Sequence, residues 1–193
     1  MSSGDPGAVA RLRAFARVQV RSGYLDDATV RNEVVEAARE DLSGDTDAES
    51  MATEVVDAEI TALIAEQADW SETTDVDRLE QAFAELSAAG LMVLRACDDH
   101  WEVTETLSRL DEAGEQVRGV VYFTHTDVWH AVDHQMLELN LWHGDTANAA
   151  PGDELLEEVL EALSRNGLHA VFDEGRIEVS LRWQWRRTPT MDG

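Results

Sequence analysis

The spacing of apolar residues divides the chain into a helical first part and a second part in which helices and strands alternate. Before residue 70, apolar side chains recur every three or four positions, the period of an amphipathic helix. After residue 74, this period alternates with short β-branched and aromatic runs that are typical of strands. The expected helices cover about 6–21, 27–42, 46–69, 74–89, 99–113 and 153–166, and the expected strands cover about 91–95, 120–123, 137–142, 168–172 and 177–185.

The last of these strands has the clearest pattern, because its side chains alternate strictly between apolar and polar. Such alternation places one face of a strand on the core and the other toward solvent. The run from Asp173 to Gly175, directly before it, predicts a hairpin turn. The apolar set of the strand is Ile177, Val179, Leu181, Trp183 and Trp185.

These elements predict an α+β protein with two parts. We expect a helical N-terminal region over residues 1–70, packed on a mixed or antiparallel sheet domain over residues 71–188, with residues 189–193 as a tail. The second part has the order β-α-β-β-α-β-β, which fits a ferredoxin-like split βαβ plan extended by one C-terminal hairpin strand. The alternative is a mixed three-layer sheet in which the helix near 74–89 covers the opposite face.

The densest group of titratable side chains lies between the strands near 120–123 and 137–142. His130 and His134 are four positions apart, so a helix would place both on one face, where they could share a metal ion. His125 and Asp127 are close enough in sequence to complete a divalent metal site. The alternative is a connecting segment whose histidines are solvated or hydrogen-bonded to nearby carboxylates. We expect no cofactor, and the segment lacks the His-Glu-x-x-His motif of many metalloproteases.

The composition adds an unusual charge to this fold. The chain has 40 acidic and 15 basic residues, and its net charge is −25. This charge opposes binding to nucleic acid and to anionic membranes, because phosphate groups are repelled. It favours instead a protein partner with a basic surface. A GC-rich genome, which we favour, and adaptation to high salt both produce such a composition.

The cysteine content and the lack of long apolar stretches bear on location and chemistry. Cys97 is the only cysteine, so the chain can form neither an internal disulfide nor a cysteine-rich zinc site. No stretch approaches the roughly 20 apolar residues of a membrane span, and the first residues lack a signal-peptide pattern. We therefore expect a cytoplasmic protein. A lone cysteine near a strand end is typical of a small buried side chain, and a nucleophile assisted by His100 is the alternative.

Two of the six tryptophans are candidate binding residues. Trp129 lies among the histidines, and Trp142 projects from the strand face opposite Leu141. If both rings are exposed, they mark a recognition surface, because aromatic side chains anchor protein interfaces. The alternative is that helices cover this face of the sheet and bury both rings.

Four stretches of the chain together match the sequence pattern of a known family. They are Ala65–Trp70, Thr74–Leu79 with Ala82, Phe83 and Leu86, Val121–Phe123 with Asp127, and Trp183–Arg187. Together they resemble an uncharacterised family of small bacterial proteins that is known only as a domain of unknown function. The resemblance implies a cysteine cluster just after the first strand and a histidine directly after the aromatic strand. Here only Cys97 lies in the first region, and Thr124 stands at the histidine position with His125 next to it.

Because the family implies a fold and no activity, the expected function depends on charge and on candidate residues. We expect a non-enzymatic, acidic protein-binding module with a regulatory or immunity-like role. A metal-dependent enzyme that uses His125–His134 is the alternative. Elemental analysis of the purified protein separates these two classes.

Overall fold

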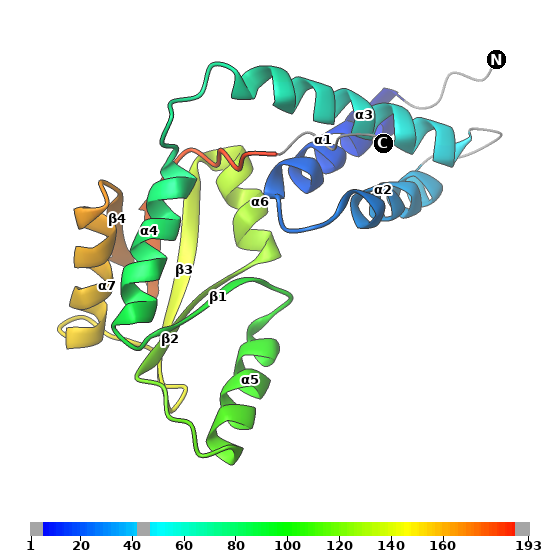
Figure 1. The fold of residues 1–193 in the computed structure, drawn as a ribbon. Coiled ribbons are helices and arrows are strands. Elements are labelled where there is room, and N and C mark those ends of the chain that lie inside the picture. Colours follow the sequence, from blue (N-terminus) through cyan, green and yellow to red (C-terminus); the bar gives the residue numbers. More distant parts are fainter. Residues whose placement is uncertain (1–5, 42–46, 188–193) are drawn as a thin grey trace. The chain divides into compact units, whose positions relative to one another are not determined.

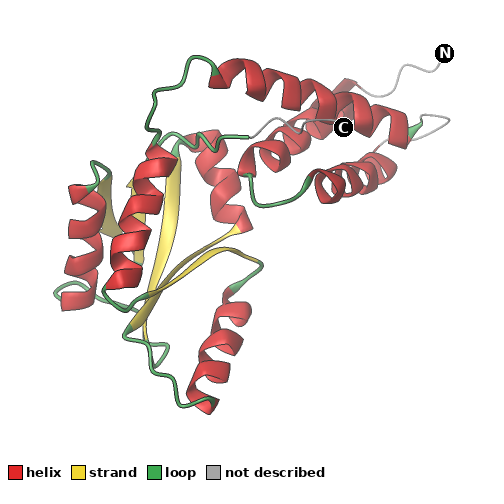
Figure 2. Cartoon of the chain, viewed as in Figure 1, coloured by secondary structure: helices red, strands yellow, loops and turns green. Residues whose placement is uncertain are grey.

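A computed structural model describes residues 6–41 and 47–187 (Figure 1). These residues form an α+β protein in which a helical N-terminal region precedes a mixed five-stranded sheet, which confirms the predicted fold class (Figure 2). None of the described helices has the length and apolar character needed to cross a membrane. The helices are α1 (Pro6–Ser22), α2 (Asp27–Asp41), α3 (Ala48–Gln67), α4 (Asp75–Ala88), α5 (His100–Glu112), α6 (His125–His134) and α7 (Glu154–Arg165). The strands are β1 (Met92–Cys97), β2 (Gly119–Thr124), β3 (Met136–His143), β4 (His169–Asp173) and β5 (Arg176–Ser180).

The described residues form two compact units. The helical unit contains the described residues of Met1–Ser71 and of Gln184–Gly193, and the sheet unit is Glu72–Trp183. The chain therefore passes between the units twice. The sequence pattern assigns residues 71–188 to the sheet domain, whereas the structure groups residues 184–187 with the helices. The expected tail, residues 189–193, lies outside the described residues.

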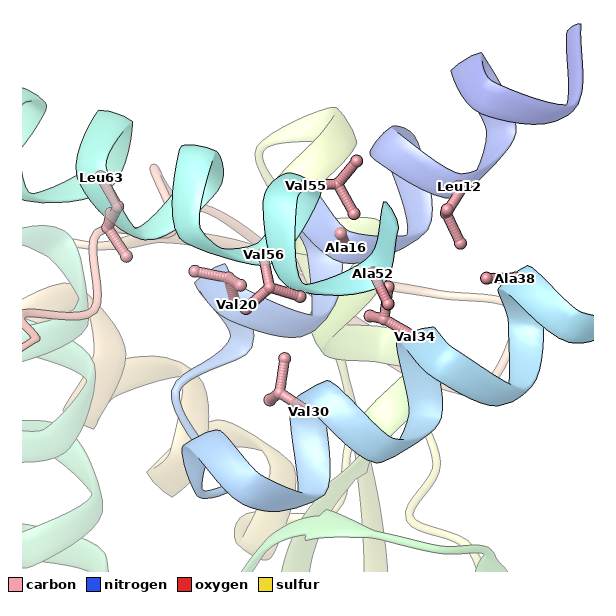
Figure 3. Packing of buried hydrophobic residues seen from close by; sticks show 10 residues of the cluster. All are labelled: Leu12, Ala16, Val20, Val30, Val34, Ala38, Ala52, Val55, Val56 and Leu63. Carbon is pink, nitrogen blue, oxygen red and sulfur yellow. The ribbon is translucent and has the colours of Figure 1, made fainter. Parts of the chain in front are cut away.

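The core of the helical unit consists mainly of small aliphatic side chains. Valine and alanine at the contacts allow α1, α2 and α3 to approach one another closely, because helix separation depends on the side chains between the axes. The buried cluster is Leu12, Ala16, Val20, Val30, Val34, Ala38, Ala52, Val55, Val56 and Leu63 (Figure 3).

The C-terminal segment packs on this unit through backbone and charge contacts. The Arg187 N–H donates to the side-chain oxygen of Gln67 at 2.6 Å, and the Gln67 amide nitrogen donates to the Arg187 carbonyl at 3.1 Å. The Arg187 guanidinium also forms an ion pair with Asp27. These contacts link the end of α3 and the start of α2 to a residue more than 100 positions later in the chain.

The strand order of the sheet is β1-β2-β3-β5-β4. The β1–β2 pair is parallel and the other pairs are antiparallel, so the sheet is mixed. In a split βαβ plan another strand separates the two parallel strands, whereas here β1 and β2 are direct neighbours. The hairpin strand β5 lies inside the sheet rather than at its edge. The ferredoxin-like prediction is therefore wrong in strand order, because β3 pairs with the free side of β2 and not with β1.

Helices cover both faces of the sheet. On one face, α4 and α7 lie side by side (Figure 1). Phe83 of α4 stacks on Phe123 of β2 with ring centroids 6.1 Å apart. On the other face, Val103 and Leu107 of α5 pack against Val120 and other buried residues of β1 and β2. This three-layer arrangement agrees with the alternative prediction for the helix near 74–89.

The last strand ends earlier than its pattern predicts, at Ser180 instead of Trp185. Leu181 and Trp183 keep the buried positions of the alternation, with 3% and 8% of their surface exposed. Their backbone, however, leaves the sheet. The Leu181 N–H donates to the carbonyl of Gln135 at 3.0 Å, and the N–H of the next residue donates to the Asp75 carboxylate at 3.0 Å. Partners outside the ladder therefore replace the strand hydrogen bonds.

Candidate binding groove at the sheet edge

The candidate site lies where the two parallel strands end. β1 leads into α5 and β2 leads into α6, and the carboxyl ends of parallel strands meet at one edge, where α/β proteins commonly bind ligands. Cys97 and Thr124 are register partners at this edge, so the two positions implied by the family resemblance come together. A groove of about 450 Å³ opens here, which we call the β-edge groove. It is lined by Asp98, Asp99, His100, Tyr122, Thr124, Thr126, Asp127, Asn140, Trp142, Asn148 and Arg176.

A bulge in β1 shapes the start of the groove. The register with β2 shifts between Leu94 and Cys97, and Ala96 has a φ of +48°. A bulge adds one residue to a strand and so changes which side chains share a face. Cys97 consequently joins Leu94 on the α5 side, where simple alternation would place Ala96.

The first turns of both helices are capped by side chains of the groove. Asp99 accepts hydrogen bonds from the N–H groups of Trp101 and Glu102 at 2.8 and 3.2 Å. At the start of α6, the Asp127 carboxylate accepts from the Thr124 N–H at 2.7 Å, and the Thr124 hydroxyl accepts from the Asp127 N–H at 3.3 Å. Carboxylates of the protein therefore occupy the positions at which helix N-termini attract anions.

Tyr122 of β2 forms the floor of the groove and has 3% of its surface exposed. Its ring packs edge-on against the ring of Trp142, with centroids 4.9 Å apart. Burial, together with the nearby Cys97 and Asp127, raises the pKa of the Tyr122 hydroxyl to about 12, although the Arg176 guanidinium opposes this shift. The hydroxyl therefore stays protonated at neutral pH.

Cys97 is also protonated at neutral pH. Burial, with the charges of Glu102 and Asp98, raises the pKa of its thiol to about 11. A cysteine acts as a nucleophile through its thiolate, so this thiol has the properties of the small buried side chain expected from the sequence.

Arg176 brings a positive charge from β5 to the groove, but carboxylates already surround it. Its guanidinium forms an ion pair with Glu138 and lies 4.0 Å from Asp127. The hydrogen bond that Arg176 donates to Glu138 raises the pKa of Arg176. At the rim, the side chain of Asp98 is 92% exposed, and the Nε2 atom of His125 lies 3.9 Å from its carboxylate. The net charge of the groove and its rim is therefore negative.

A second exposed feature begins at the first turn of α5. Trp101 is 63% exposed, and it heads a shallow hollow of about 300 Å³ along the outer side of this helix. The residues are spaced as one helical stripe, which we call the α5 face. It consists of Trp101, Thr104, Glu105, Ser108, Arg109 and Glu112.

The four candidate metal ligands lie along α6, and the structure brings them together only in part. His130 and His134 have ring centroids 4.6 Å apart. His125 lies at the first turn beside Asp98, and Asp127 is 8% exposed and used by the helix cap. Within residues 6–41 and 47–187, no three His, Cys, Asp or Glu side chains are arranged to hold a metal ion. The metal site stays a prediction.

The structure separates the two candidate tryptophans. Trp142 is half-buried on the wall of the β-edge groove, whereas Trp129 is half-buried in α6 and does not line the groove. Sequence reasoning missed Trp101, although its position outside the apolar stripe of α5 was a usable signal. It also missed Arg176 and Asn148, because only the tertiary fold brings these residues to the groove.

The fold and the groove together define an α+β protein with a polar, negatively charged groove at the carboxyl ends of two parallel strands. The family described as "Domain of unknown function (DUF6891)" matches residues 5–187. The chain belongs to this family, which confirms the resemblance. No curated protein and no solved structure matches the chain.

Proposed function

We propose that the protein is a non-enzymatic protein-binding module that recognises a basic surface of a partner protein. The single observation that carries this proposal is the 63% exposure of Trp101 on the α5 face. Tryptophan is strongly enriched among residues that dominate binding energy at interfaces. Leaving this ring in water forgoes hydrophobic stabilisation that a partner can recover by covering it.

The charge around this tryptophan indicates the chemistry of the partner. Glu105 and Glu112 lie on the same helical stripe with a single arginine, Asp98 and Asp99 precede the helix, and the whole chain carries −25. A basic partner would be steered toward this field and would also place cations near the indole face. Trp142 in the adjacent groove is the second proposed anchor.

Two buried residues at this edge of the sheet, Cys97 beside the groove and Tyr122 in it, support binding rather than catalysis. The raised pKa values of Cys97 and Tyr122, about 11 and about 12, keep both protonated at neutral pH. Neither group is therefore activated as a nucleophile or a general base. A regulatory or immunity-like role and a cytoplasmic location are part of the proposal, and they follow from the composition.

The test is capture of partners from the native extract by immobilised wild-type protein and two variants. Trp101→Ala removes the proposed anchor, and Val171→Ala is the matched control, because Val171 is 43% exposed on β4 of the same unit. We expect basic partners that the control retains and Trp101→Ala loses, with association rates that fall as salt rises. Partners that are acidic, or equally well bound by Trp101→Ala, would contradict the proposal.

The alternative is a metal-dependent enzyme centred on α6. One observation favours it: His130 and His134 face each other on adjacent turns, with ring centroids 4.6 Å apart. Two imidazoles supply half of a four-ligand zinc site, and the remaining ligands would have to come from elsewhere. About one equivalent of zinc in the purified protein, lost in His130→Ala, would support this alternative over the binding module.

A further inference from the structure

The hydroxyl of Tyr122 lacks a partner inside the protein. Within the described part of the chain it forms no hydrogen bond, although the residue is only 3% exposed and lines the β-edge groove. The hydroxyl is open to the groove that this residue lines, so a ligand or a solvent molecule can supply the missing hydrogen bond. The side-chain amides of Asn140 and Asn148 likewise form no hydrogen bonds with described residues.

The charges of the groove select a cation rather than an anion. Asp99 accepts the Trp101 and Glu102 N–H groups at the start of α5, and Asp127 accepts the Thr124 N–H at the start of α6. Both N-termini therefore already carry a carboxylate, which repels an anion. Arg176 is held by Glu138. Asp98, with 92% of its side chain exposed at the rim, is the carboxylate most open to a new partner.

The shape of the walls selects a planar cation. The half-buried indole of Trp142 provides an aromatic surface, and a guanidinium group stacks on aromatic faces and matches a carboxylate with two parallel N–H bonds. Its other N–H groups can donate to the Tyr122 hydroxyl and to the side-chain carbonyls of Asn140 and Asn148. A compact ammonium group would make the charge contact but would not use the flat wall.

We infer that the β-edge groove binds an alkylguanidinium group, supplied either by an arginine side chain of the partner or by a small free guanidine. The inference deepens the proposed function, and its protein arm rests on that function. About 450 Å³ is within the range of volumes that hold small ligands, and it exceeds what one guanidinium needs. The groove therefore has room for the side-chain stem and for part of the backbone that carries it.

The first test is a titration of the full-length protein with ethylguanidinium, followed by NMR signals of the Trp142 indole and the Asn140 and Asn148 side-chain amides. We expect saturable shifts with a dissociation constant on the order of a few mM. Ethylammonium should bind at least about threefold more weakly, and inorganic phosphate should leave these signals unchanged. Phosphate shifts, equal binding of ethylammonium, or no shift with ethylguanidinium would overturn the inference.

Two substitutions and one matched control locate the binding. Tyr122→Phe removes only the hydroxyl and should weaken ethylguanidinium about fivefold. Asp98→Asn removes the rim carboxylate and should weaken it between about threefold and tenfold. Asp111→Asn removes the same charge at the other end of α5 and should change the affinity less than about twofold. Equal weakening by Asp98→Asn and Asp111→Asn would reduce the effect to general charge attraction and overturn the inference.

The two sources of the guanidinium are separated with a blocked Gly-Gly-Arg-Gly-Gly peptide and its lysine counterpart. An arginine peptide that binds more tightly than ethylguanidinium supports a protein source, whereas an equal or weaker peptide supports a free small guanidine. If partner capture persists in Tyr122→Phe and Asp98→Asn while ethylguanidinium fails to bind, this inference fails and the proposed function stands. If ethylguanidinium binds while no basic partner is captured, the proposed function fails and the groove remains a guanidinium site.

Discussion

Replacing Gly23 with alanine tests how the C-terminal segment is held on the helical unit. Gly23 follows α1 with a φ of +81°, a conformation that side chains rarely adopt. A Cβ atom at this position would lie 2.2 Å from the ring of Trp185. This ring in turn packs against Tyr24, with centroids 4.9 Å apart. Because real Cβ contacts are never this short, the indole must move.

Two contributions set the expected size of the effect. The left-handed backbone costs about 1 to 2 kcal/mol for a residue with a Cβ. Displacing the half-buried Trp185 ring costs part of the roughly 3 to 5 kcal/mol that truncation of a core tryptophan removes, and we take this part as about 1 to 2 kcal/mol. Gly23→Ala should therefore lower the free energy of unfolding of the helical unit by about 2 to 4 kcal/mol.

The assay is urea unfolding followed by far-UV circular dichroism, with a double-mutant cycle as the control. In a Trp185→Ala background the steric contribution disappears, so Gly23→Ala should then cost only about 1 to 2 kcal/mol. Gly114→Ala is a matched control, since Gly114 has a φ of +76° with no neighbouring atom within 4 Å. It should show the backbone cost alone. Equal costs for Gly23→Ala in the two backgrounds would refute the proposed contact with the indole.

Three further predictions concern the sheet unit. Leu181→Asp places an unpaired charge at a 3% exposed position and should remove cooperative unfolding of this unit in a thermal melt; a soluble variant with an unchanged melt would contradict this. The pKa values of Cys97 and Tyr122 lie above their ordinary values of 9.0 and 10.0, at about 11 and 12. As pH rises, the unfolded chain therefore loses these protons before the folded chain does. The free energy of unfolding measured in urea should fall between about pH 9 and 12, by about 2 to 3 kcal/mol for each group. Tyr122→Phe should remove the part of this fall that is due to the tyrosine. A flat profile would argue against the burial of both. His130→Ala and His134→Ala should leave the melting temperature in zinc-containing buffer within about 2 °C of wild type, and a larger drop in both would favour the metal site.

Local pattern was sufficient to predict the strands and helices of this fold except α6, whose residues 125–134 were not assigned to a helix. Thr74, for example, caps α4 in a capping box with Asp77, at the position where the pattern predicts this helix to begin. The hairpin turn is also present, with positive φ at both Glu174 and Gly175. Strand neighbours could not be predicted in this way, because pairing depends on contacts between segments that are distant in sequence. For the same reason, the alternation through Trp185 predicted burial but not the end of the strand at Ser180.

The candidate site was predictable only in its outline. Trp142 was identified from alternation along β3, and the structure places it in the groove. Tyr122 gave no signal, since an aromatic residue in a buried strand usually belongs to the core and nothing in the sequence shows where its hydroxyl points. The bulge at Ala96, which sets the position of Cys97, requires a positive φ at a non-glycine residue. Such a conformation is imposed by tertiary structure rather than by local preference.

The most direct test of the binding account is the ¹H–¹⁵N spectrum of the six tryptophan indoles, recorded with and without a captured basic partner. The account predicts that the signals of Trp101 and Trp142 shift or broaden on binding. The signals of Trp70 and Trp185, which belong to the helical unit, should remain unchanged. Changes at Trp70 and Trp185 with unaltered signals from Trp101 and Trp142 would contradict the account and place the contact surface on the helical unit.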